Sequence, residues 1–178
     1  MAEQDEQQKQ LQGYLRGQGA KLSAEQIRDR IQETADEFLG VVQDVGEPVA
    51  RKSPAAGEWS LAEVLDHVVF TLERITGVIG GLVAGRKPAA PLETGATSGI
   101  AGLPWPELLA RLRRSQASLS ALLTANRHEP HVDLRVLEGY FGELNWKEYA
   151  LILRLHYKDH AGQVRKTLEA LRGSGSTK

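Results

Sequence analysis

Residues 144–171 read LNWKEYALILRLHYKDHAGQVRKTLEAL. Apolar side chains recur in this stretch at steps of three and four residues, as they do on one face of an amphipathic α-helix. The pattern therefore predicts a long helix over these residues. At about 100° per residue, His156 and His160 fall in the middle of the apolar face, between Leu153 and Val164. The helix is thus expected to direct two imidazoles toward the core.

Three further segments show the same period, over about residues 23–45, 60–82 and 104–125. The first two begin with Ser23 and Ser60, and each serine has a Gln or Glu three residues later, as in a capping box. No segment shows the strict alternation that is typical of a strand. Four long amphipathic helices predict an all-α protein with an antiparallel four-helix bundle.

The helices divide the chain into one domain and two tails. We expect the bundle over residues 23–172, a polar N-terminal tail over 1–22 that is disordered or a short helix, and a flexible C-terminal tail over 173–178. Long connections over 86–103 and 126–143 join the second helix to the third and the third to the fourth. Loops of this length in a compact domain are often functional.

The composition excludes several classes of protein. The chain has 178 residues and no cysteine, which excludes disulfide scaffolds, thiolate metal sites and cysteine nucleophiles. The formal net charge of -1 argues against a nucleic-acid binder. No stretch reaches the roughly 18 apolar residues of a membrane span, and the acidic, glutamine-rich N-terminus is unlike a signal peptide. We therefore expect a cytoplasmic protein with neither nucleic acid nor membrane as a partner.

The two histidines of the last helix are open to two interpretations. Spaced four residues apart, they lie one above the other and can bind the same metal ion. Alternatively, they hydrogen-bond to each other, to the backbone or to water, because buried imidazoles need polar partners. His67, at the flank of the second helix's apolar stripe, fits a residue at the rim of the core when taken alone. With His156 and His160 it would complete a three-histidine site with open coordination positions.

Other metal patterns fit the sequence less well. The segment from His156 to His160 reads HYKDH and lacks the Glu of a zinc-peptidase motif. Neither of these histidines follows a Glu by three residues, as a di-iron bundle requires. His128 and His131 lie in a polar loop, where we expect exposed side chains; a role at the mouth of the site is the alternative.

Three stretches of the chain resemble the DinB-like (DinB/YfiT) family. Residues 59–74 read WSLAEVLDHVVFTLER, residues 140–149 read YFGELNWKEY, and residues 155–168 read LHYKDHAGQVRKTL. They are similar to the family's Trp-Ser element before a histidine, its Phe-Gly-x-Leu element and its His-x-x-x-His-x-x-Gln element. The resemblance covers about residues 23–172.

By this resemblance, His67, His156 and His160 bind a divalent metal, often Ni²⁺ or Zn²⁺, inside a four-helix bundle. It further implies a homodimer and, in the characterised branches, a low-molecular-weight thiol such as bacillithiol or mycothiol. Some branches transfer this thiol to electrophiles, and one isomerises maleylpyruvate. The segments 1–22 and 86–103 match no element of the family, so the resemblance does not imply a substrate.

The leading hypothesis is a metal-dependent enzyme similar to thiol S-transferases, in which a metal-activated thiol or water attacks a small-molecule electrophile. The alternative is a non-catalytic metal-binding or protein-interaction bundle. Gln163, near His160 on the same face, is a candidate for orienting a ligand. Tyr149 could line the pocket, although core packing explains it better. Glu63 could act as a base, although the capping box explains it better.

Overall fold

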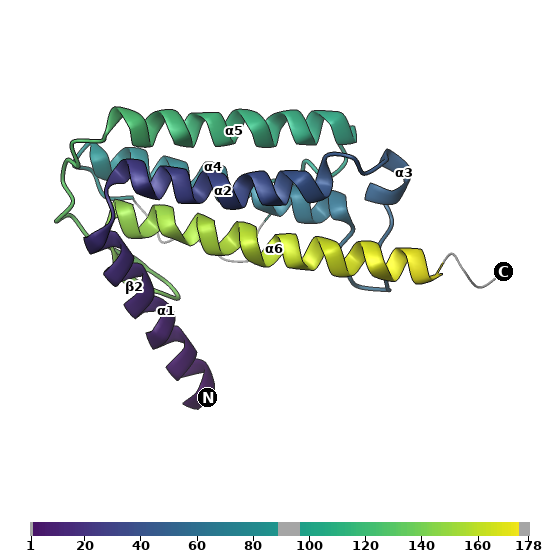
Figure 1. Cartoon of the computed structure of the whole chain (residues 1–178), viewed down its shortest axis with the longest axis horizontal. Coiled ribbons are helices and arrows are strands. Elements are labelled where there is room, and N and C mark those ends of the chain that lie inside the picture. The colour runs from purple at the N-terminus through teal and green to yellow at the C-terminus, as the bar shows by residue number, and fades with distance from the viewer. Residues whose placement is uncertain (1, 89–96, 175–178) are drawn as a thin grey trace.

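The structure is a computed structural model that describes residues 2–88 and 97–174. Four long helices form its body (Figure 1): α2 (Ala24–Val42), α4 (Leu61–Val83), α5 (Trp105–Ala125) and α6 (Trp146–Ser174). The remaining elements are α1 (Ala2–Lys21), the short α3 (Glu47–Ala50) and a hairpin of β1 (Val136–Glu138) and β2 (Gly142–Leu144). The predicted four-helix bundle is confirmed.

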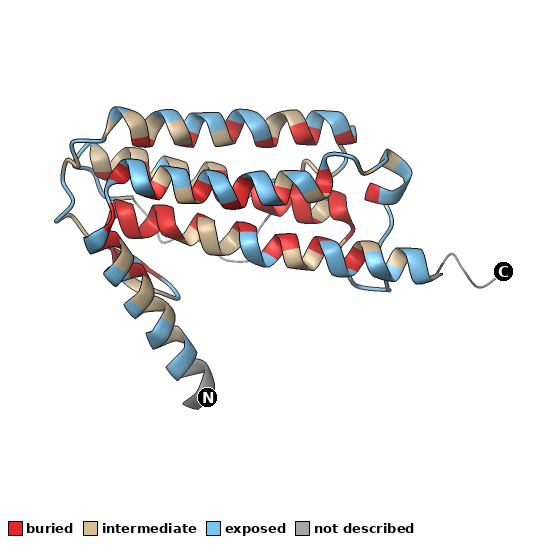
Figure 2. Ribbon diagram, in the orientation of Figure 1, coloured by how far each residue is buried: buried red, intermediate tan, exposed pale blue. Residues whose placement is uncertain are grey.

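The buried side chains lie on the faces that the four long helices turn toward one another (Figure 2). One continuous apolar cluster includes residues from all four, such as Phe38, Leu65, Leu112 and Leu153. In the part of the chain that the structure describes, no helix is long and apolar enough to cross a membrane.

The two predicted capping boxes are confirmed. Ser23 Oγ accepts a hydrogen bond from the Gln26 backbone N–H at 3.2 Å, and Gln26 Oε1 accepts one from the Ser23 N–H at 2.9 Å. Ser60 and Glu63 form the same reciprocal pair at the start of α4. Each box satisfies backbone donors that a helix start leaves without partners, which is why both helices begin where the sequence predicts.

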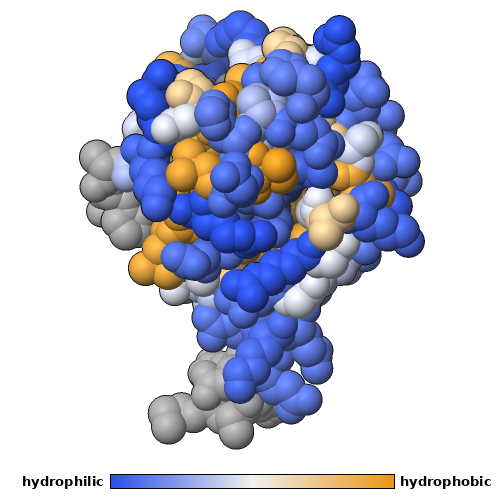
Figure 3. All heavy atoms as spheres, turned by 90° about the vertical axis from the view of Figure 1, so that its left-hand side faces the viewer, coloured by the Kyte–Doolittle hydropathy of each residue, from blue (hydrophilic) through white to orange (hydrophobic). Residues whose placement is uncertain are grey.

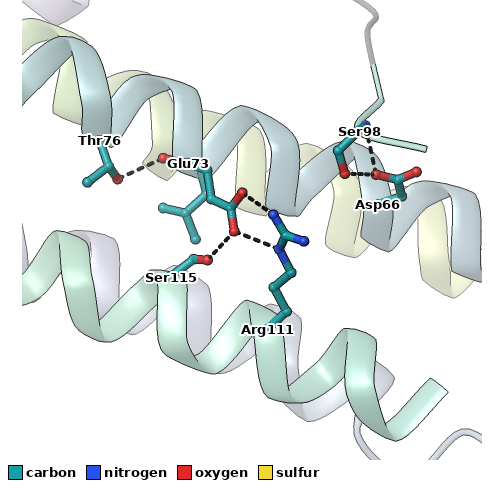
Figure 4. Close-up of polar contacts among 7 residues, drawn as sticks. Asp66, Glu73, Thr76, Ser98, Arg111 and Ser115 are labelled. Carbon is teal, nitrogen blue, oxygen red and sulfur yellow. Dashed lines mark hydrogen bonds and ion pairs between the residues drawn. The ribbon is translucent and has the colours of Figure 1, made fainter. Parts of the chain in front are cut away.

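Helices α4 and α5 run parallel, whereas α6 runs antiparallel to α4 (Figure 1). Asp66 near the start of α4 accepts hydrogen bonds from Ser98, shortly before α5 begins (Figure 4). Farther along both helices, Glu73 accepts two hydrogen bonds from Arg111, at 2.9 and 2.8 Å, and one from Ser115 at 2.8 Å. The long connection after α4 therefore returns the chain to the end of the bundle where α4 begins. Residues 89–96 of the predicted 86–103 loop lie outside the described residues.

The expectation that no segment forms a strand is wrong for residues 136–138 and 142–144. Val136 pairs with Leu144 and Glu138 with Gly142 in an antiparallel hairpin. Strands of three residues are too short to show a period of two, so the pattern could not reveal them. The turn depends on Glu138, whose Oε2 accepts hydrogen bonds from the two N–H groups that follow at positions 140 and 141, and on Gly142, which adopts a φ of 75°.

Residues 1–22 were expected to be a polar tail that is disordered or a short helix. The structure has the 20-residue helix α1 there. Leu15 is fully buried, and the amides of Gln8 and Gln12 donate to backbone carbonyls of the hairpin. Gly19 lies against Glu148 of α6, where an added Cβ would come within 2.7 Å of the Glu148 side chain. A close approach of this kind requires glycine. At the other end of the chain, residues 175–178 of the predicted flexible tail lie outside the described residues.

Candidate metal centre

Three histidines from two helices meet in the interior of the bundle. His67 comes from the second turn of α4, and His156 and His160 come from successive turns of α6. Their ring centroids are 4.9 Å apart for His67 and His156, 5.0 Å for His67 and His160, and 4.3 Å for His156 and His160. One nitrogen of each ring lies within 4.8 Å of the other two. The structure thus brings together the three histidines that the sequence analysis selected.

The packing of α4 against α6 explains this geometry. His156 and His160 share one face of α6 because they are four residues apart. The ring of Trp59, just before α4, packs against His67 with centroids 5.2 Å apart. His67 and His160 are only 9% and 8% exposed. The three histidines therefore project from packed helices, and the segment before α4 adds the ring of Trp59.

Hydrogen bonding distinguishes the ring nitrogens. Nδ1 of His160 lies 2.7 Å from Oε1 of Gln163. An amide oxygen only accepts hydrogen bonds, so this contact assigns the proton of a neutral His160 ring to Nδ1 and leaves a lone pair on Nε2. Nε2 of His156 is buried and has no hydrogen-bond partner among the residues that the structure describes. A buried nitrogen without a partner is costly unless something else binds it.

The surroundings favour neutral imidazoles. Burial lowers the pKa of His156 well below the ordinary value, and the neighbouring His160 and His67 lower it further. Burial also lowers the pKa of His160, against an opposing effect of the hydrogen bond to Gln163. Neutral rings present lone pairs, which is the form that binds a metal.

The three nitrogens fit a divalent transition metal. Two nitrogens that each bind Zn²⁺ at about 2.1 Å can be at most about 4.2 Å apart. Donors that already lie within 4.8 Å of one another need only small side-chain rotations to reach one ion. Imidazole nitrogens suit zinc, nickel, copper and iron, and three protein ligands leave coordination positions open.

The other candidate residues from the sequence lie in different surroundings in the structure. Gln163 contacts His160. Tyr149 is buried in the core, with its hydroxyl 3.5 Å from the Leu137 carbonyl oxygen. The carboxylate of Glu63 caps α4. His128 and His131 are exposed and do not belong to the histidine cluster.

A pocket of about 440 Å³ opens beside His67 and His156. Its walls come from α1, α4, α6 and the turn of the hairpin, and they include Leu11, Phe70, Phe141 and Ile152. On the face of the molecule that Figure 3 shows, mostly polar surface surrounds smaller hydrophobic areas. These residues were not predicted from the sequence. Phe70, Thr71 and Arg74 follow His67 by three, four and seven residues, a spacing that could have revealed them; no pattern in the sequence singles out Leu11.

Comparisons with known proteins agree with this architecture. The model of a family described as the DinB superfamily matches residues 30–164. Among solved structures, TT2238, a four-helix bundle protein, is 18% identical to this chain, with a TM-score of 0.60. The match covers 81% of this chain and 99% of the TT2238 chain. Two structures of mycothiol-dependent maleylpyruvate isomerase, one of them a mutant, are 14% and 13% identical, with TM-scores of 0.68 and 0.67. Each match covers 81% of this chain and 61% of the isomerase, and identities this low show a shared fold. A search of curated proteins finds no match.

Proposed function

The chain belongs to the DinB superfamily, and on that premise we propose that His67, His156 and His160 bind one divalent metal ion in a thiol-dependent enzyme. One observation carries the proposal: three buried or half-buried histidines converge, and the Nε2 of His156 has no hydrogen-bond partner among the described residues. In the alternative, the three are core histidines whose ring nitrogens hydrogen-bond to one another, to the backbone or to water. Nickel and zinc are the metals we expect first.

The metal would lower the pKa of a bound thiol or water and so supply a nucleophile at neutral pH. The histidines would act as neutral ligands, and Gln163 would hold the ring of His160 in position. The pocket beside His67 and His156 would hold the electrophile. In the transfer, a bond forms between the thiol sulfur and an electrophilic carbon, the leaving group departs with its electron pair, and the thiol proton passes to solvent.

The thiol is a proposal that rests on the likeness to two solved structures. Two structural neighbours are named as mycothiol-dependent isomerases, although this chain spans only 61% of their length. The chain itself has no cysteine, so a thiol used in the reaction would come from solution, but this absence is no argument for a thiol. The homodimer that the resemblance implies and the cytoplasmic location expected from the sequence stay predictions.

Thiol consumption tests the proposed function directly. Purified protein, loaded with Ni²⁺ or Zn²⁺ or stripped by a chelator, is mixed with mycothiol or bacillithiol and chlorodinitrobenzene. Because the chain has no cysteine, a colorimetric thiol reagent detects only the added thiol. A free thiol is only a few per cent ionised at neutral pH, so the metal-loaded protein should consume it about tenfold faster or more.

Two results would contradict parts of this proposal. Metal binding without thiol consumption for any electrophile tested would favour the non-catalytic metal-binding bundle. Thiol consumption that is equal with and without metal would remove the metal from the reaction.

Replacing Gln163 should weaken metal binding without removing it. Gln163→Leu deletes the acceptor that orients His160, and the loss of such a supporting hydrogen bond typically costs about 10- to 100-fold in metal affinity. Gln163→Glu keeps an acceptor oxygen and should retain most of the affinity. Competition with a chromogenic chelator measures both; equal affinity in the parent and the Leu variant would show that Gln163 plays no part.

A further inference from the structure

The pocket beside the histidines is bordered by an element outside the matched family region. Leu11 of α1 forms part of its wall, whereas the family match begins at residue 30. The opposite walls come from α4, α6 and the hairpin turn at residues 140 and 141. The helix α1 therefore adds a surface that the matched bundle does not supply.

From the composition of these walls, we propose that the pocket binds the aromatic or branched alkyl body of the electrophile, and that α1 determines this specificity. The inference rests on the proposed function, because it assigns the substrate class of the same site. Six apolar side chains line the pocket: Leu11, Phe70, Ile75, Phe141, Ile152 and Leu155.

Two of the charged side chains that line the pocket already have partners within the protein. Oε2 of Glu138 already accepts hydrogen bonds from the backbone N–H groups of Tyr140 and Phe141, at 2.8 and 2.6 Å. The guanidinium of Arg74 lies over the ring of Phe70, 5.5 Å from its centroid. A sugar-based thiol would lose hydrogen bonds to water against such a lining, whereas an apolar group gains by leaving water. The pocket thus suits the electrophile better than the polar thiol.

The size and direction of the pocket fit a ligand with one reactive end. It begins at His67 and follows α4 as far as Ile75, a distance of about 12 Å at 1.5 Å per residue. Its volume of about 440 Å³ lies within the range of about 300–1,000 Å³ that is typical of small-molecule sites. A single ring or two fused rings of the electrophile can occupy the apolar part of the pocket while its electrophilic carbon faces the histidines.

Helix α1 is fixed well enough to select a ligand. Leu15 anchors it in the core, and Tyr14 accepts a hydrogen bond from Arg154 of α6. Gln8 and Gln12 donate to the carbonyls of Tyr140 and Phe141. Leu11 lies between these anchors along the chain, so we treat it as a specificity-determining residue.

A neutral fluorescent probe tests the apolar pocket independently of the reaction. The fluorescence of N-phenylnaphthylamine increases in apolar surroundings. The probe is titrated into the full-length protein with and without metal. We expect one site per chain, and a Kd about tenfold higher in Leu11→Gln and in Ile152→Gln, which introduce a polar amide on two different walls. Gln10→Ala, at an exposed position of α1, is the matched control and should bind as the parent does. Circular dichroism and thermal unfolding check that each variant is folded.

Kinetics provide the second measurement. Leu11→Gln should raise KM for chlorodinitrobenzene about tenfold and leave kcat within about twofold, while KM for the small electrophile iodoacetamide stays unchanged. Probe binding that is the same in the parent and in both pocket variants would overturn the inference. If the two substitutions weaken probe binding, but the parent protein binds no metal and consumes no thiol, the apolar pocket is supported and only the proposed function is refuted.

Discussion

The His156→Ala protein should contain almost no divalent metal after incubation with Ni²⁺ or Zn²⁺ and dialysis, whereas the parent should hold about one ion per chain. Removing one of three nitrogen donors should lower the affinity by more than the roughly 10- to 100-fold typical of a residue that only supports a ligand. His156 is the most informative choice, because its Nε2 has no hydrogen-bond partner among the described residues. Elemental mass spectrometry measures the metal content.

The control is another histidine of the same chain. His128 is exposed in a loop, so His128→Ala should bind metal as the parent does. Thermal unfolding gives a second measurement, because a ligand that binds only the folded state raises Tm. Metal should raise the Tm of the parent and of His128→Ala but not that of His156→Ala or His160→Ala. Equal metal content in all four proteins would refute the three-histidine site.

Arg135→Ala should destabilise the protein by about 3 kcal/mol, since it leaves a buried carboxylate without its cation. Arg135 donates to both carboxylate oxygens of Glu148, at 2.8 and 2.9 Å, and the Glu148 side chain is only 2% exposed. Glu148 also accepts a hydrogen bond from the Asn145 N–H, while Asn145 Oδ1 accepts one from the Glu148 N–H. The ion pair therefore joins the start of α6 to the segment that enters the hairpin.

A second arginine of the same chain serves as the matched control. Arg165 pairs with Glu37 at 2.7 Å, but both side chains are nearly half exposed. Exposed ion pairs contribute about 0–1 kcal/mol, so Arg165→Ala should be almost neutral. In a chain of this length, a loss of about 3 kcal/mol corresponds to a fall in Tm of about 6–12 °C. We expect this fall for Arg135→Ala and not for Arg165→Ala. Similar losses in both variants, measured by denaturant and thermal unfolding, would show that burial does not strengthen the Arg135 pair.

The sequence by itself determined the four long helices, the capping boxes of α2 and α4, and the histidine pair of α6. These features depend on local physical chemistry. A helical period places His156 and His160 on one face, and a serine followed by Gln or Glu three residues later satisfies the first backbone donors. The choice of His67 as the third member of the cluster came from the resemblance, because its own position at the flank of α4 also fits an ordinary rim residue.

Two further features were not revealed by the sequence: one depends on contacts between distant segments, and the other is a hairpin of very short strands. Glu129 stands between the two loop histidines, yet its carboxylate accepts from the Ala24 N–H and from the buried Lys147. The hairpin is too short to produce an alternating pattern, and its turn is held by Glu138. Neither arrangement has a local signal, because the partners are far apart in the chain or the elements too short.

The walls of the pocket separate most clearly what could be predicted from the sequence and what only the tertiary structure shows. The period of α4 places Phe70 and Arg74 on the side of His67, so this wall could have been predicted from spacing. Leu11 could not, because α1 shows no sustained apolar period and is held by its contacts with the hairpin and α6. The sequence therefore determined which residues could bind a metal, whereas only the tertiary structure decided what surrounds them, since a pocket wall is made by elements that meet after each has folded.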